Sequence, residues 1–282
     1  MSRFVEIWDD KFAQNRATQP GIDAWFIHTP RLPTKGFPAV GLTTLLISQT
    51  EDAETRSVWE ALRGAFVFAT VQHRRFEGVD AIKGLEYCLG DLPQISQVVV
   101  HAPNGGDEDG IKQIGELLRR VSAPLSVIVT SKSGEFPLEL FDICIRADAN
   151  PLALTTLSTL IMVQGLDATV EYVCIDVEDI KYVMGNTASG ARLVEALWLP
   201  ATRKLVFIDE REAEYVEGSC ALWVSIEGMQ PSLSQHREIL KSLPLGNEKR
   251  KSERNFMFNQ PIRQYYTTAL YGSATRVRIL CR

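Results

Sequence analysis

The chain lacks the features that would place it in several broad classes of protein. Its 282 residues include only five cysteines and no CxxC pair, which argues against a zinc site and for reduced thiols in a cytosol-like compartment. It has no excess of positive charge, since the net charge is −5. The overall charge therefore does not favour nucleic acid or an anionic membrane as a partner. It also lacks an apolar run near the roughly 18–20 residues that span a bilayer, and its acid-containing N-terminus is not a signal peptide. We therefore expect a cytoplasmic protein.

Recognisable catalytic motifs are also missing. There are only four histidines, with no Ser–His–Asp order, no GxSxG and no metal-ligand spacing, so no metal is expected. Two of the histidines, His28 and His101, end apolar runs, at the sheet edge where open α/β folds bind ligands. One alternative is therefore an α/β small-ligand binder or enzyme, with both histidines in one crevice at the carboxyl ends of the strands and Asp107 as a base partner.

What the sequence does contain is an alternation of apolar runs and helical patterns in its first half. The runs are short and rich in Val, Ile and Phe, as in strands buried on both faces. Helical patterns cover Glu54–Leu62, Asp80–Leu89 and the acidic-started stretch from Ile111 to Val121. Strands that alternate with helices predict a mostly parallel sheet covered on both faces. The first connection is an exception, because Pro30, Pro33 and Pro38 forbid a useful helix there.

The second half predicts a different kind of structure. Pro151 opens a long helical pattern that is apolar nearly all round, which is typical of a buried helix. Strand-like runs follow, among them Lys204–Ile208, Ala221–Ile226 and Arg276–Cys281. We therefore expect an α/β domain over residues 1–149, a central helix over 150–171 and a smaller, partly antiparallel α+β domain over 172–282.

Residues 97–130 combine a phosphate-binding layout with the wrong charges. An apolar strand runs into a turn and then a helix, and in many nucleotide-binding folds such a turn holds phosphates with free N–H groups. Here the turn reads NGGDEDG, with Asn104, Gly105, Gly106, Asp107, Glu108 and Asp109. Its acids suit an empty helix N-terminus, where negative charge is favourable. A solvated turn is one interpretation, and a Mg²⁺ or Ca²⁺ site is another, although the EF-hand spacing is missing.

Three segments in this order resemble the FtsZ/tubulin superfamily. Residues 97–130 resemble the strand, glycine-rich GGGTGTG loop, helix and strand of FtsZ. CIDVEDIKYVM (residues 174–184) is similar to the segment that ends the central helix of FtsZ and reaches the nucleotide of the next subunit. The stretch from GSCALWVSIEG (residues 218–228) to the end is similar to the closing strands of the family. The resemblance implies a parallel nucleotide-binding-type sheet joined by a central helix to a smaller activation domain.

The sequence departs from the family where the nucleotide would bind. The GGGGxN phosphate loop after the first strand is replaced by the proline-rich HTPRLPTKGFPAVG, and the GGGTGTG loop by NGGDEDG. GTP carries about four negative charges near its phosphates, and each carboxylate within about 4 Å would cost roughly 1–4 kcal/mol at effective dielectric constants of about 80 to 20. We therefore expect neither normal GTP binding nor GTPase activity, and GTP is disfavoured as a cofactor.

The acids near the end of the central segment are retained. The family's acids at the positions of Asp176 and Asp179 approach the nucleotide of the neighbouring subunit, so the resemblance makes Asp176, Glu178 and Asp179 a partner-contacting loop. The alternative is an ordinary helix start with a capping residue and first-turn acids. The resemblance implies a cytoskeletal protein that assembles with itself or regulates an active FtsZ-type partner. Because the sequence ends directly after its last strand, no direct membrane anchor is expected.

Overall fold

The computed structural model divides into two compact units. The residues that it describes are 21–29, 42–49, 53–65, 69–91, 95–103, 107–131, 138–147, 150–165, 176–185, 190–227, 232–245, 255–259 and 275–282. The first unit comprises Met1–Cys144 with Asn150–Leu157, and the second comprises Ile145–Ala149 with Ser158–Arg282. Strand β6 (Ile143–Arg146) and helix α4 (Leu152–Gly165) each contribute residues to both units. The division into residues 1–149, 150–171 and 172–282 stays a prediction.

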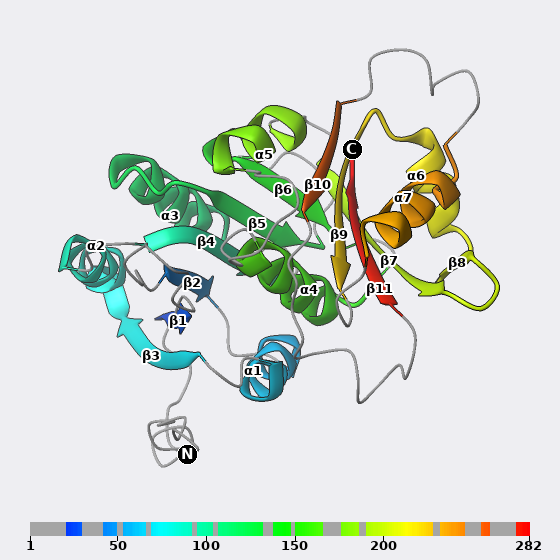
Figure 1. The fold of residues 1–282 in the computed structure, drawn as a ribbon. Helices are drawn as coiled ribbons and strands as arrows, with labels where there is room; N and C mark the ends of the chain where they lie inside the picture. Colours follow the sequence, from blue (N-terminus) through cyan, green and yellow to red (C-terminus); the bar gives the residue numbers. More distant parts are fainter. Residues whose placement is uncertain are drawn as a thin grey trace, which may run out of the picture. The chain divides into compact units, whose positions relative to one another are not determined.

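The first unit is built on a mixed sheet (Figure 1). Its strands are β1 (Gly21–Thr29), β2 (Leu42–Ser48), β3 (Thr70–Glu77), β4 (Ile95–Ala102) and β5 (Ser126–Thr130). They lie in the order β5-β4-β2-β1-β3. The strands β2, β4 and β5 are parallel, as predicted, whereas β1 is antiparallel to both β2 and β3. The antiparallel β1–β2 pair agrees with the proline-rich connection that separates these strands, because no crossover helix is needed there.

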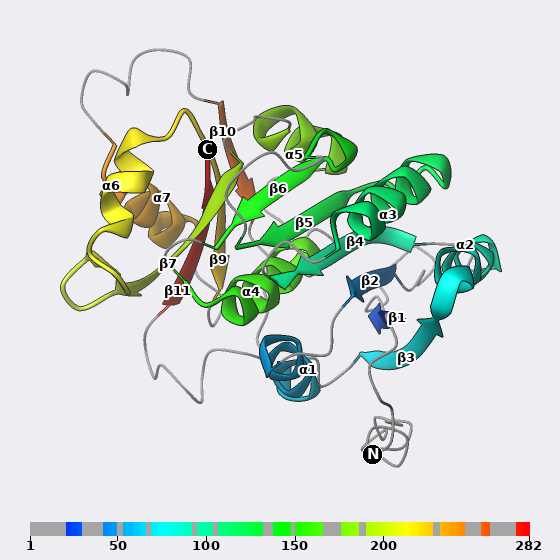
Figure 2. The ribbon, with the colours of Figure 1, turned by 180° about the vertical axis from the view of Figure 1, so that it is seen from behind.

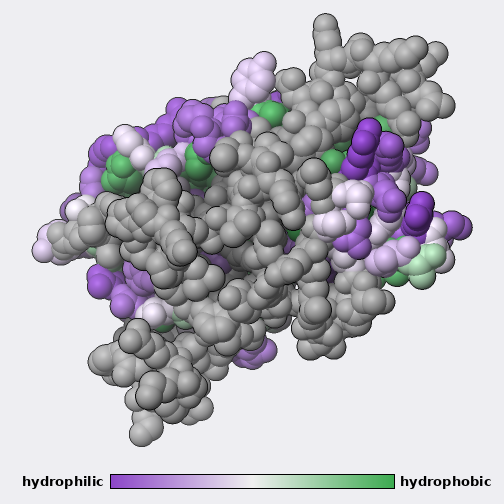
Figure 3. All heavy atoms as spheres, in the orientation of Figure 1, coloured by the Kyte–Doolittle hydropathy of each residue, from purple (hydrophilic) through white to green (hydrophobic). Residues whose placement is uncertain are grey.

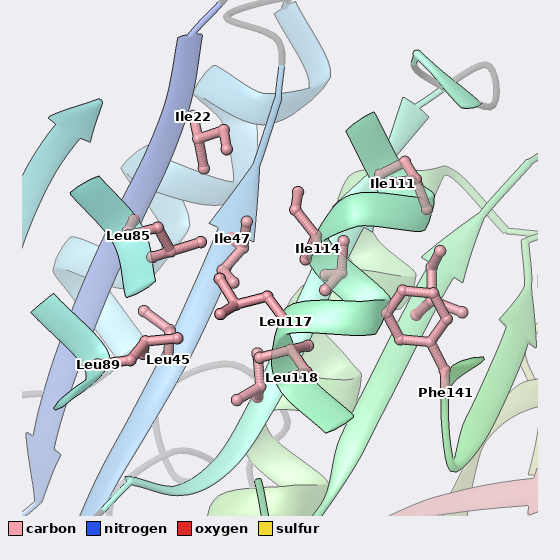
Figure 4. Packing of buried hydrophobic residues seen from close by; sticks show 14 of the residues in the cluster. Ile22, Leu45, Ile47, Leu85, Leu89, Ile111, Ile114, Leu117, Leu118 and Phe141 are labelled. Carbon is pink, nitrogen blue, oxygen red and sulfur yellow. The ribbon is translucent and has the colours of Figure 1, made fainter. Parts of the chain in front are cut away.

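Two amphipathic helices cover one face of this sheet. The helices of the unit are α1 (Ala53–Ala65), α2 (Ala81–Asp91) and α3 (Glu108–Arg120), with short 3₁₀ turns at Gly78–Asp80 and Leu138–Leu140. The apolar residues of α3 recur at a spacing of three and four, and are buried (Ile111, Ile114, Leu117 and Leu118). With Leu85 and Leu89 of α2, they join one core with Leu45 and Ile47 of β2 (Figure 4). The sequence pattern had predicted all three helices.

The opposite face of the same sheet carries several buried polar pairs. Trp25 points there, because its neighbours Ala24 and Phe26 belong to the core under α2 and α3. Its ring lies 4.8 Å from that of Trp59 in α1. The hydrogen bonds on this face include Gln97 Nε2 to Thr44 Oγ1 at 2.6 Å, Ser48 Oγ with Thr55 Oγ1 at 3.3 Å and His101 Nδ1 with Thr156 Oγ1 at 2.6 Å. These bonds offset the cost of burying polar groups.

The second unit holds a partly antiparallel sheet, which the sequence also predicted. Its strands are β7 (Ala191–Leu199), β8 (Lys204–Phe207), β9 (Ala221–Glu227), β10 (Asn255–Asn259) and β11 (Thr275–Cys281). The order is β10-β9-β11-β7, with β8 beside the end of β7. The helices of the unit are α5 (Val177–Met184), α6 (Glu212–Gly218) and α7 (Leu233–Ser242). Helices α6 and α7 pack on one face, through Val216, Ile239 and Leu243 (Figure 2).

A buried ion cluster lies on the face of these strands opposite α6 and α7. The Arg278 guanidinium donates to Glu195 Oε1 at 2.7 Å and also to Glu227, and all three side chains are at most 3% exposed. Ser158 of α4 donates to Glu195 Oε1 at 2.9 Å. Burial alone would lower the pKa of Arg278, but the two carboxylates raise it, so the guanidinium keeps its charge.

None of the helices that the structure describes is long and apolar enough to cross a bilayer.

Candidate functional site

The helix start at α3, where the sequence resemblance predicted a phosphate-type loop, is acidic and open to solvent. Strand β4 ends at Ala102, and Asp107 has extended backbone before the first residue of α3, Glu108. The carbonyl of Asp107 accepts the N–H of Ile111 at 2.9 Å, which opens the helix. Asp107, Glu108 and Asp109 are all exposed. The other three residues of the predicted loop, Asn104, Gly105 and Gly106, lie outside the described residues.

A side chain from a neighbouring strand occupies the N-terminus of α3. Gln49 directly follows β2, and its Oε1 accepts the backbone N–H of Asp107 at 3.1 Å. The approach is close, because a Cβ added to Gly110 would lie 2.1 Å from Gln49 Nε2. Sequence reasoning missed Gln49. The sequence feature that could have identified Gln49 is its position directly after a buried strand parallel to β4. The carboxyl ends of parallel neighbouring strands meet at one edge of the sheet.

This arrangement opposes the binding of an anion. The amide oxygen of Gln49 uses an N–H that a phosphate would need. The exposed carboxylates of α3 add negative charge at the same end of the helix, where the helix dipole favours it. Across the parts of the chain that the structure describes, no three His, Cys, Asp or Glu side chains converge as ligands for a metal ion.

The predicted partner-contacting loop forms the start of α5. Asp176 is the N-cap, and its Oδ1 accepts the N–H of Asp179 at 2.8 Å. Asp179 Oδ2 in turn accepts the N–H of Asp176 at 3.3 Å, which completes a capping box. Glu178 Oε1 lies 3.4 Å from Lys181 Nζ. All three acids are exposed, so the cap uses one oxygen of each aspartate while the carboxylates face solvent.

Packing and a tight C-terminus hold α5 in place within the second unit. Ile180, Val183 and Met184 are buried. At the other end, the N–H of Gly185 donates to the carbonyl of Lys181 at 2.7 Å. Arg282 Nη1 donates to the carbonyl of Gly185 at 2.9 Å, which adds a cation where the helix dipole favours one. The structure therefore presents the acids of α5 on a helix that is anchored by its buried face and at its C-terminal end.

The two histidines of the alternative ligand site do not share a crevice, which corrects that expectation. His28 lies opposite Thr43 at the start of β2, whereas His101 lies opposite Ser48 at its end. The reason is that β1 runs antiparallel to β2, so its carboxyl end lies at the other edge of the sheet. Five residues of strand separate the two positions by about 17 Å. His101 is also only 1% exposed, and its Nδ1 is bonded to Thr156 Oγ1.

His28 is half-buried, and its Nδ1 lies 2.9 Å from Thr43 Oγ1. Burial lowers its pKa, because the charged imidazolium loses hydration. His28 therefore lies at the opposite edge of the sheet from His101, and His101 is buried in the interior. The two histidines do not line one crevice.

Comparison with known proteins gives a distant structural likeness. No family model matches the chain, and no curated protein matches it. An empty dimer of FtsZ from M. jannaschii is 14% identical, with 72% of this chain and 68% of that chain covered and a TM-score of 0.46. A single-substitution mutant of the same FtsZ is 13% identical, covering 71% and 68%, with a TM-score of 0.47. A GTPγS-form protofilament of TubZ from Bacillus thuringiensis serovar israelensis is 13% identical, covering 72% and 66%, with a TM-score of 0.39. All three TM-scores lie below 0.5, so this likeness carries no argument about the function of the chain.

Proposed function

We propose that this chain is a cytoplasmic FtsZ/tubulin-like cytoskeletal protein that neither binds nor hydrolyses GTP in the usual way. It assembles with itself or regulates an active FtsZ-type partner. The observation that carries this proposal is the hydrogen bond from the Asp107 N–H to Gln49 Oε1 at 3.1 Å. It lies at the helix start where the resemblance expects a phosphate.

The charges and the hydrogen-bond donors at the start of α3 oppose nucleotide binding. A phosphate at a helix N-terminus needs free N–H groups and a positive local potential. At α3 one N–H is bonded to Gln49, and three exposed acids surround the first turn. A bound nucleotide would have to displace the amide and accept several carboxylates near its own charges, each of which opposes binding.

Helix α5 keeps the exposed acids that the resemblance assigns to a partner-contacting loop. A chain without a working nucleotide site can still supply this loop to the nucleotide of a neighbouring subunit. It would then act at one end of a filament as a capper, a co-assembling subunit or an activator of hydrolysis. The rigid attachment of α5, through its buried face and Arg282, supports this role because positioning a carboxylate requires a fixed backbone.

The experiment separates the charge of the loop from its capping function. Helix α7 has the same capping box made of uncharged residues, Ser232 and Gln235. The double variant Asp176→Ser with Asp179→Gln would copy this box into α5 and remove both charges while keeping the cap. We expect the natural chain to change the GTP hydrolysis rate or the sedimentation of an active FtsZ, and the double variant to have no effect.

A matched control is Ser232→Asp with Gln235→Glu, which creates an acidic capping box on α7 and leaves the acids of α5 in place. This variant should act on the partner as the natural chain does. The proposal fails if the natural chain leaves the partner's hydrolysis and assembly unchanged and also fails to sediment by itself. It fails equally if the double variant on α5 acts as strongly as the natural chain while both remain folded by circular dichroism.

A further inference from the structure

The hairpin of β7 and β8 exposes an unusual share of apolar surface. Eight large hydrophobic side chains are exposed among the described residues, and three of them lie on this hairpin. They are Leu199, Val206 and Ile208, which are 36%, 46% and 55% exposed. Figure 3 shows apolar atoms at the place that the hairpin occupies in Figure 1. The alternate residues Leu205 and Phe207 pack against the core under α6 and α7.

The strand β8 also offers an open edge. Among the strands that the structure describes, β8 pairs only with β7. The N–H of Ile208 donates to the carbonyl of Glu195 at 3.1 Å, which continues by one residue the antiparallel register that pairs Ala196 with Phe207. Because bonded pairs alternate along such a ladder, Val206 and Lys204 face β7 with their backbone groups. The backbone groups of Leu205 and Phe207 therefore point outward.

We propose that two copies of this chain associate through β8, in antiparallel pairing about a two-fold axis at Val206. In this register Leu205 lies opposite the partner's Phe207, and the same pair recurs on the other side of the axis. These are the residues whose N–H and C=O groups point outward, so each pair exchanges two backbone hydrogen bonds. The same short surface serves both copies, as a closed two-fold dimer requires.

The side chains fit this register. Val206 faces the partner's Val206, and Lys204 faces the partner's Ile208, at the non-hydrogen-bonded positions where side chains lie closest. The stem of lysine covers an apolar neighbour while its ammonium group stays in water. The pairing therefore covers part of the two side chains that are most exposed on this hairpin, Val206 and Ile208.

The residues that flank β8 carry opposite charges. Arg203 precedes the strand in a turn, with φ of 52°, and Asp209 follows the strand. The two-fold axis brings Arg203 of each copy near the partner's Asp209. Arg203 already lies 3.8 Å from Glu238, and Asp209 pairs with Arg211 of its own chain at 2.6 Å, so the added attraction is modest.

The proposed dimer does not rest on the proposed function, because β8 is separate in sequence from the acids of α5. The first test uses cysteine pairs in a Cys220→Ser background, since Cys220 is the exposed thiol among the described cysteines. Directly opposed Cα atoms at a non-hydrogen-bonded position lie about 4.5 Å apart, which is within the range that a disulfide spans.

The two-fold axis predicts a specific pattern of cross-links under mild oxidation. Val206→Cys should form a covalent dimer by itself. Lys204→Cys and Ile208→Cys should form little dimer alone but should cross-link when the two variants are mixed. Val79→Cys, at a side chain 98% exposed on the other unit, is the control for random collision. The proposal is overturned if Val206→Cys cross-links no faster than Val79→Cys, or if Lys204→Cys alone cross-links as fast as Val206→Cys.

Sedimentation equilibrium of the uncross-linked chain provides the second test. We expect a reversible dimer whose Kd rises by at least about tenfold in Val206→Lys, while Val79→Lys leaves the Kd unchanged. A natural chain that stays monomeric up to about 0.1 mM, where a dimer with a Kd of about 1 μM would be largely formed, would overturn the proposal. The Asp176→Ser with Asp179→Gln variant should dimerise normally, so a failure of this proposal and a failure of the proposed function give different results.

Discussion

At the residue scale, close backbone approach makes Gly185 a demanding position in α5. A Cβ built on it would lie 2.1 Å from the carbonyl oxygen of Lys181, which is a backbone atom that cannot rotate away. The N–H of Gly185 donates to that same oxygen. The glycine therefore allows the helix to end where Arg282 can reach it.

We predict that Gly185→Ala destabilises the chain by about 1–3 kcal/mol, because the side chain must push the last turn of α5 aside. Chemical denaturation of the natural chain and the variant measures the difference. Gly218→Ala is the matched control, since nothing lies within 4 Å of its added Cβ and alanine is the better helix former. Equal stability of the natural chain and Gly185→Ala would contradict this account of the helix end.

A second residue with a defined effect is His236 of α7, which is 2% exposed. Burial lowers its pKa from the ordinary value of 6.5, so the unfolded chain binds a proton more readily than the folded chain. Stability should therefore fall as the pH drops below about 6.5. We predict that His236→Gln loses less free energy of unfolding than the natural chain between about pH 7 and pH 5.5. Parallel losses in the two proteins would show that His236 does not contribute.

At the element scale, α5 shows how one pair of acids serves the fold. Asp176 and Asp179 each accept a backbone N–H at the helix start, so part of their effect is structural. The ordinary interpretation from the sequence, a capping residue and first-turn acids, thus describes the geometry. The partner-contacting role stays a prediction beside it.

We predict that Asp176→Ala lowers the free energy of unfolding by about 1 kcal/mol, because it leaves the Asp179 N–H without its cap. Asp176→Ser should restore most of the loss, since a hydroxyl oxygen caps as well as a carboxylate. Thermal and urea denaturation of the three proteins checks this order. A Ser variant as unstable as the Ala variant would mean that the charge, rather than the cap, stabilises α5.

The elements also show what the sequence pattern can and cannot predict. Helix α3 was predictable because its apolar residues follow one face and its first turn is acidic. Strand β7 was not predicted, because ARLVEALWL (residues 191–199) consists largely of good helix formers. It becomes a strand because both of its faces are buried in the sheet, where Val194 and Trp198 face one core and Glu195 the ion cluster. Tertiary packing, rather than local helix propensity, therefore determines the secondary structure of β7.

The candidate site was predictable to a similar extent. The acids of α3 and α5 were visible in the sequence, because each lies directly before a periodic apolar pattern. Gln49 was not, because its contact with Asp107 joins residues 58 positions apart. The separation of His28 from His101 was also hidden, since it depends on β1 running antiparallel to β2.

At the scale of the whole molecule, the two units hold different candidate functional features. The first unit holds the α3 helix start, where Gln49 and the acids oppose a phosphate. The second unit holds the acids of α5 and the open edge of β8. Under the proposed function, the chain would contact partners through its second unit, and its first unit would need no nucleotide.

Calorimetry with GTP and GDP, in the presence and absence of Mg²⁺, tests whether the chain has a working GTP site. We predict no measurable binding up to about 1 mM nucleotide and no rise in melting temperature. For comparison, a ligand at about 100 times its Kd would stabilise the fold by about 2.7 kcal/mol, which is easily detected. Micromolar binding of GTP would show that the chain does have a working GTP site. Gln49 and the carboxylates of α3 would then have to move aside or be bridged by the metal ion.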